Sequence, residues 1–421
     1  MVIGGSSRAA ALWFLFLASL LTALNFYDRY VISIVVEDLK GAFALSDSQI
    51  GLLSGLAFAV VYSIASIPIA RYADRDRHAR VLGLSALIWS AMSGACGFAA
   101  GFWTLLLARF GVGLGESGGA PTTQALIARR FSSRWRGTAF GVIGVAGATG
   151  AIVALSGGGT IAHLYGWRTV FYAGAVTGIP IALVLLLTVR DSPRAAAEAR
   201  PAAIPFSVAL RTLVNRRAYM WTCAGLAFAT LGPYGLTAWM PAYLMRQFHL
   251  DSQQVGATYA VSIGIATLIG VVLGGVVGDW LNRRDVRAPL YLLIASFGIT
   301  APLQIAVLLT NDYATVLALA VPQTVIAMIW VSPTYALIQA LSGRRLGATG
   351  AAFYAMLINL IGQGLGPSLA GWLSDVLAPS FGEQSLRYAL IIEVCSCFPG
   401  VIAFAMATRT AREDIAEANR D

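Results

Sequence analysis

Residues 12–36 read LWFLFLASLLTALNFYDRYVISIVV, an apolar run that is interrupted by one pair of charges, Asp28 and Arg29. A helix needs about 20 apolar residues to cross a bilayer, so this run is long enough to span one. A charge at the middle of such a helix costs about 2.5–3.5 kcal/mol on insertion scales, and charges placed there commonly face a cavity and have a function. A second apolar run, 102–127, contains Arg109 and Glu116. The meaning of these charges depends on whether the runs cross a membrane.

The composition indicates a polytopic membrane protein. Of the 421 residues, 57% are hydrophobic and only 12% are charged, and the mean hydropathy is +0.72. Soluble domains, by contrast, carry about 25% charged residues. Twelve stretches have the length and apolar character of membrane spans, namely 11–36, 48–70, 81–100, 102–128, 137–161, 169–189, 218–244, 255–281, 288–309, 313–341, 347–374 and 386–408.

The basic residues test this number of spans, because lysine and arginine collect in cytoplasmic loops. With the N-terminus inside, all but six of the 29 basic residues fall in inner segments. The six exceptions are two within spans, Arg29 and Arg109, and four in outer segments: Lys40, Arg168, Arg246 and Arg387. One span more or fewer would destroy this alternation. The sequence therefore predicts an all-α membrane protein with twelve transmembrane helices and both termini in the cytoplasm.

The same residues exclude several other classes of function. The net charge of +9 comes from basic loops beside membrane spans, which anionic headgroups attract, so we expect no nucleic-acid partner. The cysteines lie within spans and the three histidines in separate loops, so we expect no metal.

Motifs for nucleotides and for catalysis are also lacking. The only lysine, Lys40, is followed by Gly41, which excludes a P-loop and ATP as the energy source. Residues 113–118 match the dinucleotide-binding pattern, but they lie in an apolar helix with no preceding strand. Paired intramembrane histidines, HExxH and the paired aspartates of a membrane protease are absent from the sequence. We therefore expect neither a cofactor nor an enzymatic activity.

The longest polar stretch divides the spans six and six. We interpret 1–190 as an N-terminal six-helix bundle, 191–217 as a cytoplasmic linker, and 218–421 as a C-terminal six-helix bundle with a short cytoplasmic tail.

Each half carries a similar loop after its second span. Residues 70–77 read ARYADRDR, and residues 275–284 read GVVGDWLNRR. An aspartate at a helix end can accept hydrogen bonds from a neighbouring helix N-terminus and can pair with nearby arginines. We interpret four residues of these loops as a conformational latch: Asp74, Arg75, Asp279 and Arg283.

These paired loops resemble the loop motif of the major facilitator superfamily, in which two six-helix bundles alternate access to a central site. The first copy departs from the motif by having Ala70 where the family normally has glycine. Residues 109–121, RFGVGLGESGGAP, resemble the arginine-plus-glycine motif of proton-linked members. With NFYDR at 25–29 and WMPAY at 239–243, nearly the whole chain resembles the spinster family, and closely its bacterial homologues.

Helix geometry relates the buried charges to one another. At 1.5 Å per residue, Asp28 lies roughly 12 Å below the outer end of its span and Arg109 about 10 Å below the surface, so the two can pair. Arg109 and Glu116 are seven residues apart and share a helix face, with Gly113 between them. Pro121 loosens the helix one turn beyond Glu116, because proline removes a backbone hydrogen bond.

We interpret Asp28 and Glu116 as proton-coupled switches, and Arg109 as their counter-ion or as the anchor for an anionic group of the substrate. The alternative is a buried ion-pair network that only fixes helix register. Arg29 points some 100° away from Asp28 around the helix, so we expect it to make a structural contact between helices. Glu393, an acid in the last span, is expected to have a structural or interface role.

Further polar or amphipathic residues lie in spans that the resemblance places around the central cavity. Any one of them is more often a contact between helices than a substrate ligand. With Arg109, the candidates for the substrate cavity are Tyr27, Gln124, Tyr234, Trp239, Tyr243, Gln339, Asn359 and Gln363.

The resemblance implies a proton-coupled or facilitative transporter that works by alternating access on a lysolipid or a sphingosine-type lipid. A proton symporter of sugar acids or other small organic anions is the main alternative, and a lipid scramblase or a receptor is a minor one. The expected partners are membrane lipids, protons and a small amphipathic or anionic substrate. We expect a monomer in a cell membrane, the inner membrane if the source is bacterial.

Overall fold

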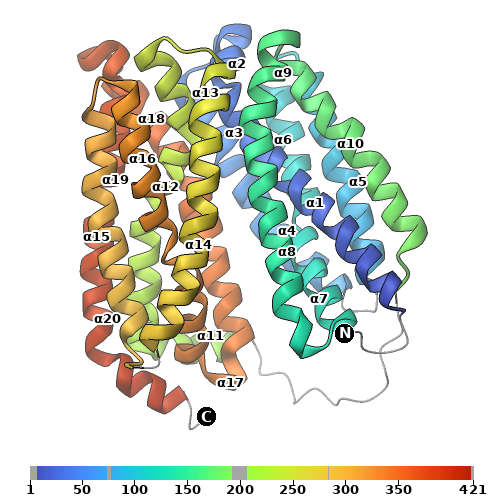
Figure 1. The fold of residues 1–421 in the computed structure, drawn as a ribbon, viewed down its shortest axis with the longest axis vertical. Coiled ribbons are helices and arrows are strands. Elements are labelled where there is room, and N and C mark those ends of the chain that lie inside the picture. The colour runs from blue at the N-terminus through green and yellow to red at the C-terminus, as the bar shows by residue number, and fades with distance from the viewer. Residues whose placement is uncertain (1–6, 74–76, 192–205, 283, 419–421) are drawn as a thin grey trace. The chain divides into compact units, whose positions relative to one another are not determined.

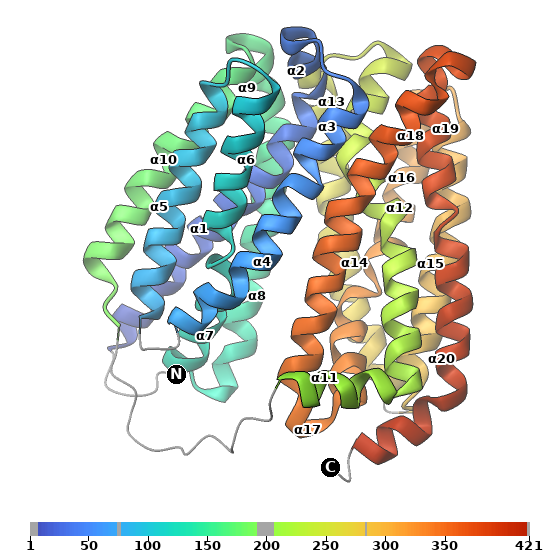
Figure 2. The ribbon, with the colours of Figure 1, turned by 180° about the vertical axis from the view of Figure 1, so that it is seen from behind.

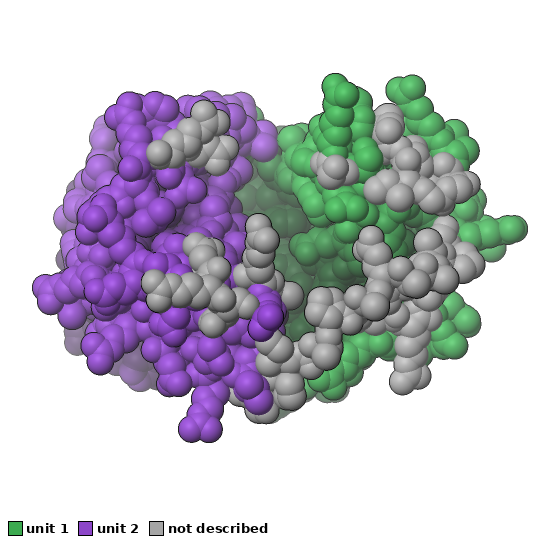
Figure 3. Space-filling model, turned by 90° about the horizontal axis from the view of Figure 1, so that it is seen from below, with its two compact units in different colours: residues 1–198, 240–264 green, residues 199–239, 265–421 purple. Residues whose placement is uncertain are grey.

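The structure is a computed structural model of the chain, and it describes residues 7–73, 77–191, 206–282 and 284–418. Within these ranges it consists of helices joined by short connections, and it contains no strand. The chain divides into two compact units (Figure 3). Unit 1 comprises Met1–Glu198 and Met240–Gly264, and unit 2 comprises Ala199–Trp239 and Ile265–Asp421.

Unit 1 contains the first ten α-helices and one π-helix (Figures 1 and 2). In chain order they are α1 (Arg8–Ile34), α2 (Val36–Phe43), α3 (Asp47–Ser54), α4 (Leu56–Ala73), α5 (His78–Gly97), α6 (Phe102–Glu116), α7 (Gly119–Arg130), α8 (Ser133–Ile152), η1 (Val153–Gly157), α9 (Gly158–Tyr165) and α10 (Trp167–Thr188). From the second half of the chain it also takes the last residues of α12 (Arg217–Phe248), then α13 (Ser252–Val255), η2 (Gly256–Ala260) and the start of α14 (Val261–Asn282).

Unit 2 contains the remaining helices. They are α11 (Phe206–Asn215), most of α12 and α14, α15 (Ala288–Leu309), α16 (Tyr313–Met328), α17 (Val331–Leu357), η3 (Ile358–Leu365), α18 (Gly366–Phe381), η4 (Gly382–Gln384), α19 (Ser385–Val394) and α20 (Cys397–Ala418).

Each of the twelve expected spans falls on helices. Nine helical stretches in the described parts of the chain are long and apolar enough to cross a membrane, and the last of them, Arg345–Ala418, covers two expected spans. Two expected spans are not among the nine. One is 102–128, which is divided into two short helices, α6 and α7, and the other is 218–244, which lies within α12.

Close approach of the backbones holds unit 1 together. α8 lies directly on α1, where a Cβ at Gly150 would overlap the main-chain oxygen of Ala23. The two π-helices η1 and η2 also meet, and a Cβ at Gly256 would lie 2.5 Å from the Leu155 carbonyl oxygen. Small residues at such contacts let membrane helices pack by dispersion where the hydrophobic effect gives little help.

The ends of unit 1 differ in charge. The Arg130 guanidinium donates to the Arg190 carbonyl at 2.7 Å, and the Ala79 amide donates to Asp191 at 2.6 Å, so the loops after α4, α7 and α10 lie together. We call this end, which carries Arg77, Arg130 and Arg190, the basic end of unit 1. Lys40 and Arg168 lie at the opposite end.

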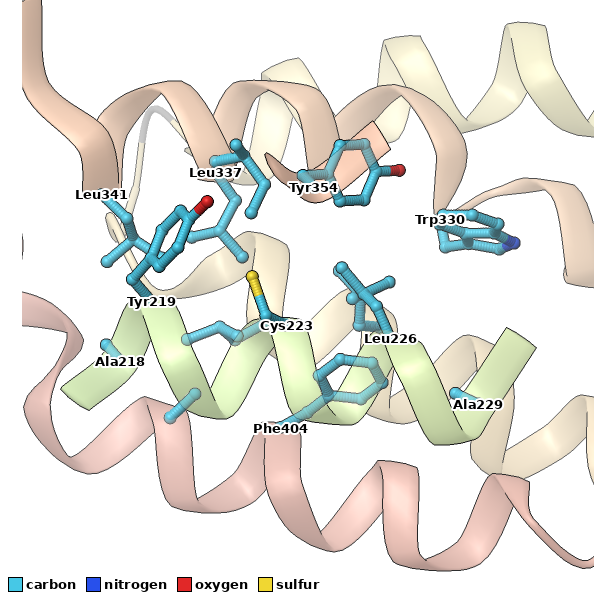
Figure 4. Close-up of a cluster of buried hydrophobic side chains, with 14 of the residues drawn as sticks. Ala218, Tyr219, Cys223, Leu226, Ala229, Trp330, Leu337, Leu341, Tyr354 and Phe404 are labelled. Atoms are coloured by element: carbon cyan, nitrogen blue, oxygen red, sulfur yellow. The ribbon is translucent and has the colours of Figure 1, made fainter. Parts of the chain in front are cut away.

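The core of unit 2 forms around the first half of α12. Figure 4 shows Cys223 and Leu226 of α12 between Phe404 of α20 and the side chains of α17. Phe404 also stacks on Phe297 of α15, with ring centroids 5.8 Å apart. Burial of an aromatic ring of this size dominates the local packing energy.

Candidate functional site

Four buried or half-buried charges of unit 1 form one cluster between α1 and α6. We call Asp28, Arg29, Arg109 and Glu116 the charged cluster. Asp28 and Arg109 are each 2% exposed, Glu116 is 1% exposed, and the Arg29 side chain is 18% exposed. Ionised groups removed from water in this way must be compensated by partners, so their contacts define what the site can do.

Arg29 is the partner of Glu116. Its Nε lies 2.8 Å from Oε2 of Glu116, in an ion pair that joins α1 to α6. The guanidinium also lies over the Phe58 and Tyr62 rings of α4, at 4.9 and 5.2 Å from their centroids. The second oxygen of Glu116, Oε1, has no hydrogen-bond partner among the described residues. The expected interhelix contact of Arg29 is thus with a residue predicted to take up protons.

Asp28 is held by a hydroxyl group. Ser93 of α5 donates to Oδ1 of Asp28 at 2.5 Å, while Oδ2 has no partner in the described structure. This second acid therefore also has one buried carboxylate oxygen without a hydrogen-bond partner in the described ranges. A single serine in an apolar span gives no signal in the sequence, so Ser93 was not predicted.

Arg109 contacts the main chain of Asp28 and not its carboxylate. Its Nη1 donates to the Asp28 carbonyl oxygen at 3.2 Å, and its Nε donates to the Leu53 carbonyl oxygen at 3.4 Å. The expected pairing of the two side chains is replaced by these contacts. Leu53 lies in the last turn of α3, where helical carbonyl groups lack an intrahelical donor, and this free acceptor attracts the guanidinium.

The geometry of α6 depends on its glycines and on the break that follows it. A Cβ at Gly113 would lie 2.9 Å from the Phe58 carbonyl oxygen, so glycine lets α6 approach α4 between Arg109 and Glu116. The helix ends at Glu116, and α7 begins at Gly119. The two residues between these helices, Ser117 and Gly118, keep right-handed helical dihedral angles, so the break is a local loosening directly after Glu116.

Three of the predicted cavity residues direct their polar atoms or rings into their own unit. The Tyr27 hydroxyl donates to the Val170 carbonyl oxygen at 2.8 Å, and Trp239 Nε1 donates to the Pro367 carbonyl oxygen at 2.8 Å. The Tyr243 ring packs edge-on against Phe248, at 6.5 Å between centroids. These contacts position helices, and the predicted substrate contacts of the three residues stay predictions.

The other cavity candidates are divided between the two units, with Gln124 in unit 1 and the rest in unit 2. Gln124 lies on α7, directly after the break that follows Glu116. Tyr234 contacts Gly362, Gln339 is exposed on α17, and Asn359 and Gln363 lie on the π-helix η3. The Asn359 amide donates within its own helix to the Ala355 carbonyl oxygen at 2.9 Å.

The predicted latch lies outside what the structure describes. Asp74, Arg75 and Arg283 are not among the described residues, and neither is the side chain of Asp279.

A different ion-pair cluster lies at the opposite end of unit 1. Arg246, near the end of α12, contacts Asp47 through both terminal nitrogens at 2.8 Å and Glu37 through Nε at 2.8 Å. Lys40 also pairs with Asp47. Burial alone would lower the pKa of Arg246, but its hydrogen bonds and the charges of Asp47 and Glu37 outweigh burial and raise the pKa. Arg246 therefore stays charged and fixes the end of α12 to α2 and α3.

Glu393 in α19 is a buried acid with no polar partner. Its side chain is 2% exposed, and neither carboxyl oxygen has a hydrogen-bond partner within the described ranges. It fits because the facing residues are small: a Cβ at Gly235 of α12 would overlap Oε2, and one at Gly366 of α18 would lie 3.4 Å from Oε1. The structural or interface role expected for Glu393 stays a prediction, and no charged side chain among the described residues pairs with it.

Known proteins share this fold. The family model described as Major Facilitator Superfamily matches residues 18–367. A solved structure of a bacterial homologue of the human lysosomal transporter spinster, inward-facing and unoccupied, superimposes with a TM-score of 0.88 at 26% identity, over 97% of this chain and 99% of that one.

Curated relatives match over most of their length. An MFS-type efflux pump of Mycolicibacterium smegmatis is 31% identical over 96% of this chain and 94% of its own. A probable L-galactonate transporter of Escherichia coli is 24% identical over 97% and 90%, and the sphingosine-1-phosphate transporter SPNS2 of Danio rerio is 25% identical over 88% and 78%. The chain belongs to the Major Facilitator Superfamily and is a membrane transporter of the spinster type.

Proposed function

We propose that this transporter is proton-coupled and moves an amphipathic organic anion, with Glu116 and Asp28 as the groups that take up protons. The observation that carries the proposal is the Arg29–Glu116 ion pair, at 2.8 Å beside a second buried acid, with one oxygen of each carboxylate lacking a hydrogen-bond partner among the described residues. An intramembrane acid with a free oxygen is well placed to exchange a proton.

Protonation changes what the arginines can bind. When Glu116 takes a proton at Oε1, its charge no longer compensates Arg29, and the guanidinium becomes a site for the anionic group of a substrate. Arg29 suits this role because its side chain is the most exposed of the four and lies over two aromatic rings. When the substrate leaves, the ion pair re-forms as Glu116 loses its proton. Proton and anion are thus coupled through one guanidinium.

The relatives favour an anion of one of two kinds. The name of SPNS2 indicates a phosphorylated amphipath, and the Escherichia coli relative is named for a sugar acid. Each would present one anionic head, which the Arg29 guanidinium could bind once Glu116 is protonated. We propose the lysolipid or sphingosine-type class first, because the spinster homologue structure and the spinster relatives match most of this chain. The sugar acid is the second candidate.

We further propose that the basic end faces the cytoplasm and that both termini lie there. This orientation follows from the preference of arginine for cytoplasmic loops. The protein would then act as a monomer in the cell membrane, with lipids, protons and the substrate as its partners.

The test is uptake into proteoliposomes with an imposed pH gradient. The probes are radiolabelled lysophosphatidylglycerol, sphingosine-1-phosphate and L-galactonate, each measured with and without the gradient. We expect one class to accumulate with the gradient and to saturate, and Glu116→Gln to abolish the response to the gradient. Asp312→Asn, which changes a helix-capping acid in unit 2 far along the chain, is the control and should leave the response intact.

Full pH-dependent uptake by both Glu116→Gln and Asp28→Asn would overturn the proposal. Flux without any gradient dependence would favour a scramblase, and binding without flux would favour a receptor.

A further inference from the structure

Glu393 is a buried acid of unit 2 that the proposed function does not use. Its carboxyl group lies directly against the main chain of α12, where a Cβ at Gly235 would come within 2.5 Å of both oxygens. Beside it is the start of α18, where a Cβ at Gly366 would lie 3.4 Å from Oε1. Both oxygens are shielded from solvent and lack a hydrogen-bond partner among the described residues. The carboxyl group is therefore enclosed between α12, α18 and its own helix, α19.

The helices around Glu393 offer it no opposite charge. α15 and η3 contain no charged residue, and α12 has arginines only at its two ends. On α19 itself, Arg387 is bound to the connection between α15 and α16. In α18 the nearest charge is another acid, Asp375, which lies nine residues or about 13 Å beyond Gly366.

The titratable neighbours of Glu393 are uncharged groups. The Cys397 thiol of α20 lies close enough for its titration to depend on the charge of Glu393. Tyr234 of α12 packs against Gly362 of η3. A carboxylate buried without a compensating partner costs several kcal/mol, and such groups take up a proton instead. Glu393 is therefore a neutral carboxylic acid in this conformation.

The three helices that enclose Glu393 each lose regular α-helical bonding at this level. In α12, Pro233 has no N–H group, so the Ala229 carbonyl oxygen lacks its helical donor and accepts from Cys397 Sγ at 3.4 Å. The π-helix η3 passes into α18 at Gly366. α19 ends one residue after Glu393, and α20 begins at Cys397. We call these the three hinge points, because prolines and π-helical turns are usual places for a helix to bend.

Burial decides when Glu393 can exchange its proton. Solvent is kept from both oxygens in this conformation, because the main chain of α12 at Gly235 covers the carboxyl group. The proton is retained for as long as α12 stays packed against α18 and α19. Bending at the hinge points would part these helices and admit water, and a hydrated glutamate is ionised at neutral pH.

We propose that Glu393 is a proton-binding site of unit 2, which holds a proton in this conformation and releases it when α12 moves away from α18 and α19. The step breaks the carboxyl O–H bond and transfers the proton to a water molecule, so unit 2 gains one negative charge. Because opening releases a proton, a higher pH favours the opened arrangement. For one proton the equilibrium shifts by up to about tenfold per pH unit.

Infrared spectroscopy tests whether the carboxyl group is protonated, because the C=O band of a carboxylic acid is separate from the bands of a carboxylate. We expect Glu393→Gln to lose a carboxylic-acid band at neutral pH. Glu383→Gln is the matched control, since Glu383 is exposed in η4 and should lose carboxylate bands instead. Loss of carboxylate bands in Glu393→Gln would overturn the proposal. If this variant does not fold, Glu393→Leu provides the same difference spectrum without a buried amide.

Cysteine labelling tests whether proton release accompanies opening. Cys397 is buried beside Glu393, whereas Cys395 is exposed two residues earlier. Tandem mass spectrometry gives the ratio of their labelling rates with N-ethylmaleimide, which corrects for the general rise of thiol reactivity with pH. We expect the ratio of Cys397 to Cys395 to rise with pH by up to about tenfold per unit, and to rise much less in Glu393→Gln. The same pH dependence in both proteins would contradict the proposal.

Neither measurement involves Glu116 or a substrate, so the site in unit 2 goes beyond the proton uptake proposed for Glu116 and Asp28. If both readouts at Glu393 fail while Glu116→Gln abolishes the response to the gradient, only the site in unit 2 is refuted. If both readouts are as expected while Glu116→Gln and Asp28→Asn keep full pH-dependent uptake, only the proposed function is refuted.

Discussion

Asp28 and Arg29 are adjacent in the chain, yet their side chains bind different helices. Asp28 accepts a hydrogen bond from Ser93 of α5, whereas Arg29 pairs with Glu116 of α6. Neighbouring residues on a helix point about 100° apart, so α1 can reach both helices from one turn. Changes at either residue should therefore be separable in experiment.

Replacing Arg29 alone should destabilise unit 1 more than replacing Arg29 and Glu116 together. Arg29→Met leaves the Glu116 carboxylate buried without its partner, and such a loss typically costs about 3–5 kcal/mol in the free energy of unfolding. Arg29→Met/Glu116→Gln should recover most of that loss, because no buried charge remains. Denaturant titration of the protein in bicelles measures both variants. Equal destabilisation of the single and the double variant would contradict the prediction.

Asp28→Asn should preserve the fold and alter the pH dependence of transport. The amide oxygen can still accept the Ser93 hydroxyl, so the free energy of unfolding should change little. The amide cannot take up a proton at neutral pH, so uptake should depend less on pH. Ser93→Ala serves as the comparison: it leaves Oδ1 of Asp28 without its partner and should cost about 1–3 kcal/mol of stability. If Asp28→Asn unfolds the protein instead, the Ser93 contact does not hold this region.

Gly235→Ala should destabilise unit 2 through a clash with Glu393. The added methyl group would overlap Oε2, and overpacking of this kind costs about 1–3 kcal/mol. A shorter side chain at the other position removes the clash, so Gly235→Ala/Glu393→Ser should be more stable than Gly235→Ala alone. Thermal unfolding monitored by fluorescence compares the variants. Gly298→Ala is the control, since a Cβ there meets no atom within 4 Å.

Asp285, which lies in a loop outside the membrane spans, should titrate at an unusually low pH. Hydrogen bonds from the main chain and side chain of Arg287, with a smaller contribution from Arg412, lower the pKa of Asp285 from 3.8 to about 2. A depressed folded-state pKa means that the stabilisation is present above pH 3.8 and is lost as the pH falls through 2. Arg287→Ala should move the titration midpoint of Asp285 up toward 3.8, and Arg412→Ala should move it less. Carbon-13 NMR of labelled aspartate measures the midpoints, and a larger shift in Arg412→Ala would reverse the assignment.

The fold could be predicted from the sequence because the relevant signals are long and redundant. Apolar runs of membrane length and arginines in alternate loops each indicate the same topology, and the family comparisons confirm the fold. The division of 102–128 at Ser117 was less predictable, because a proline in a membrane helix can either bend or break it.

The site was only partly predictable. Asp28, Arg109 and Glu116 could be predicted as site residues, because charged residues within an apolar run are recognisable in the sequence and are energetically costly in a membrane. The partner of each charge was not visible, because pairing depends on which helices are neighbours and how each is rotated. Arg29 was assigned a structural contact and is the partner of Glu116, while Arg109 binds carbonyl groups at a helix end. Ser93 is an uncharged residue in an apolar span, where a serine carries no distinctive pattern.

The π-helix η3 has a consequence for how this family tolerates changes in length. A π-helical turn contains one residue more than an α-helical turn, and such segments often lie at functional sites. Loss of one residue within Ile358–Leu365 would let the helix continue in α form, so the span would survive a deletion that would otherwise be harmful. The residues after the deletion would shift along the membrane normal by no more than one residue. The side chains of Asn359 and Gln363, however, would point in different directions relative to each other than they do now. A homologue one residue shorter at this point can therefore share the fold and differ in which polar groups it presents to its cargo.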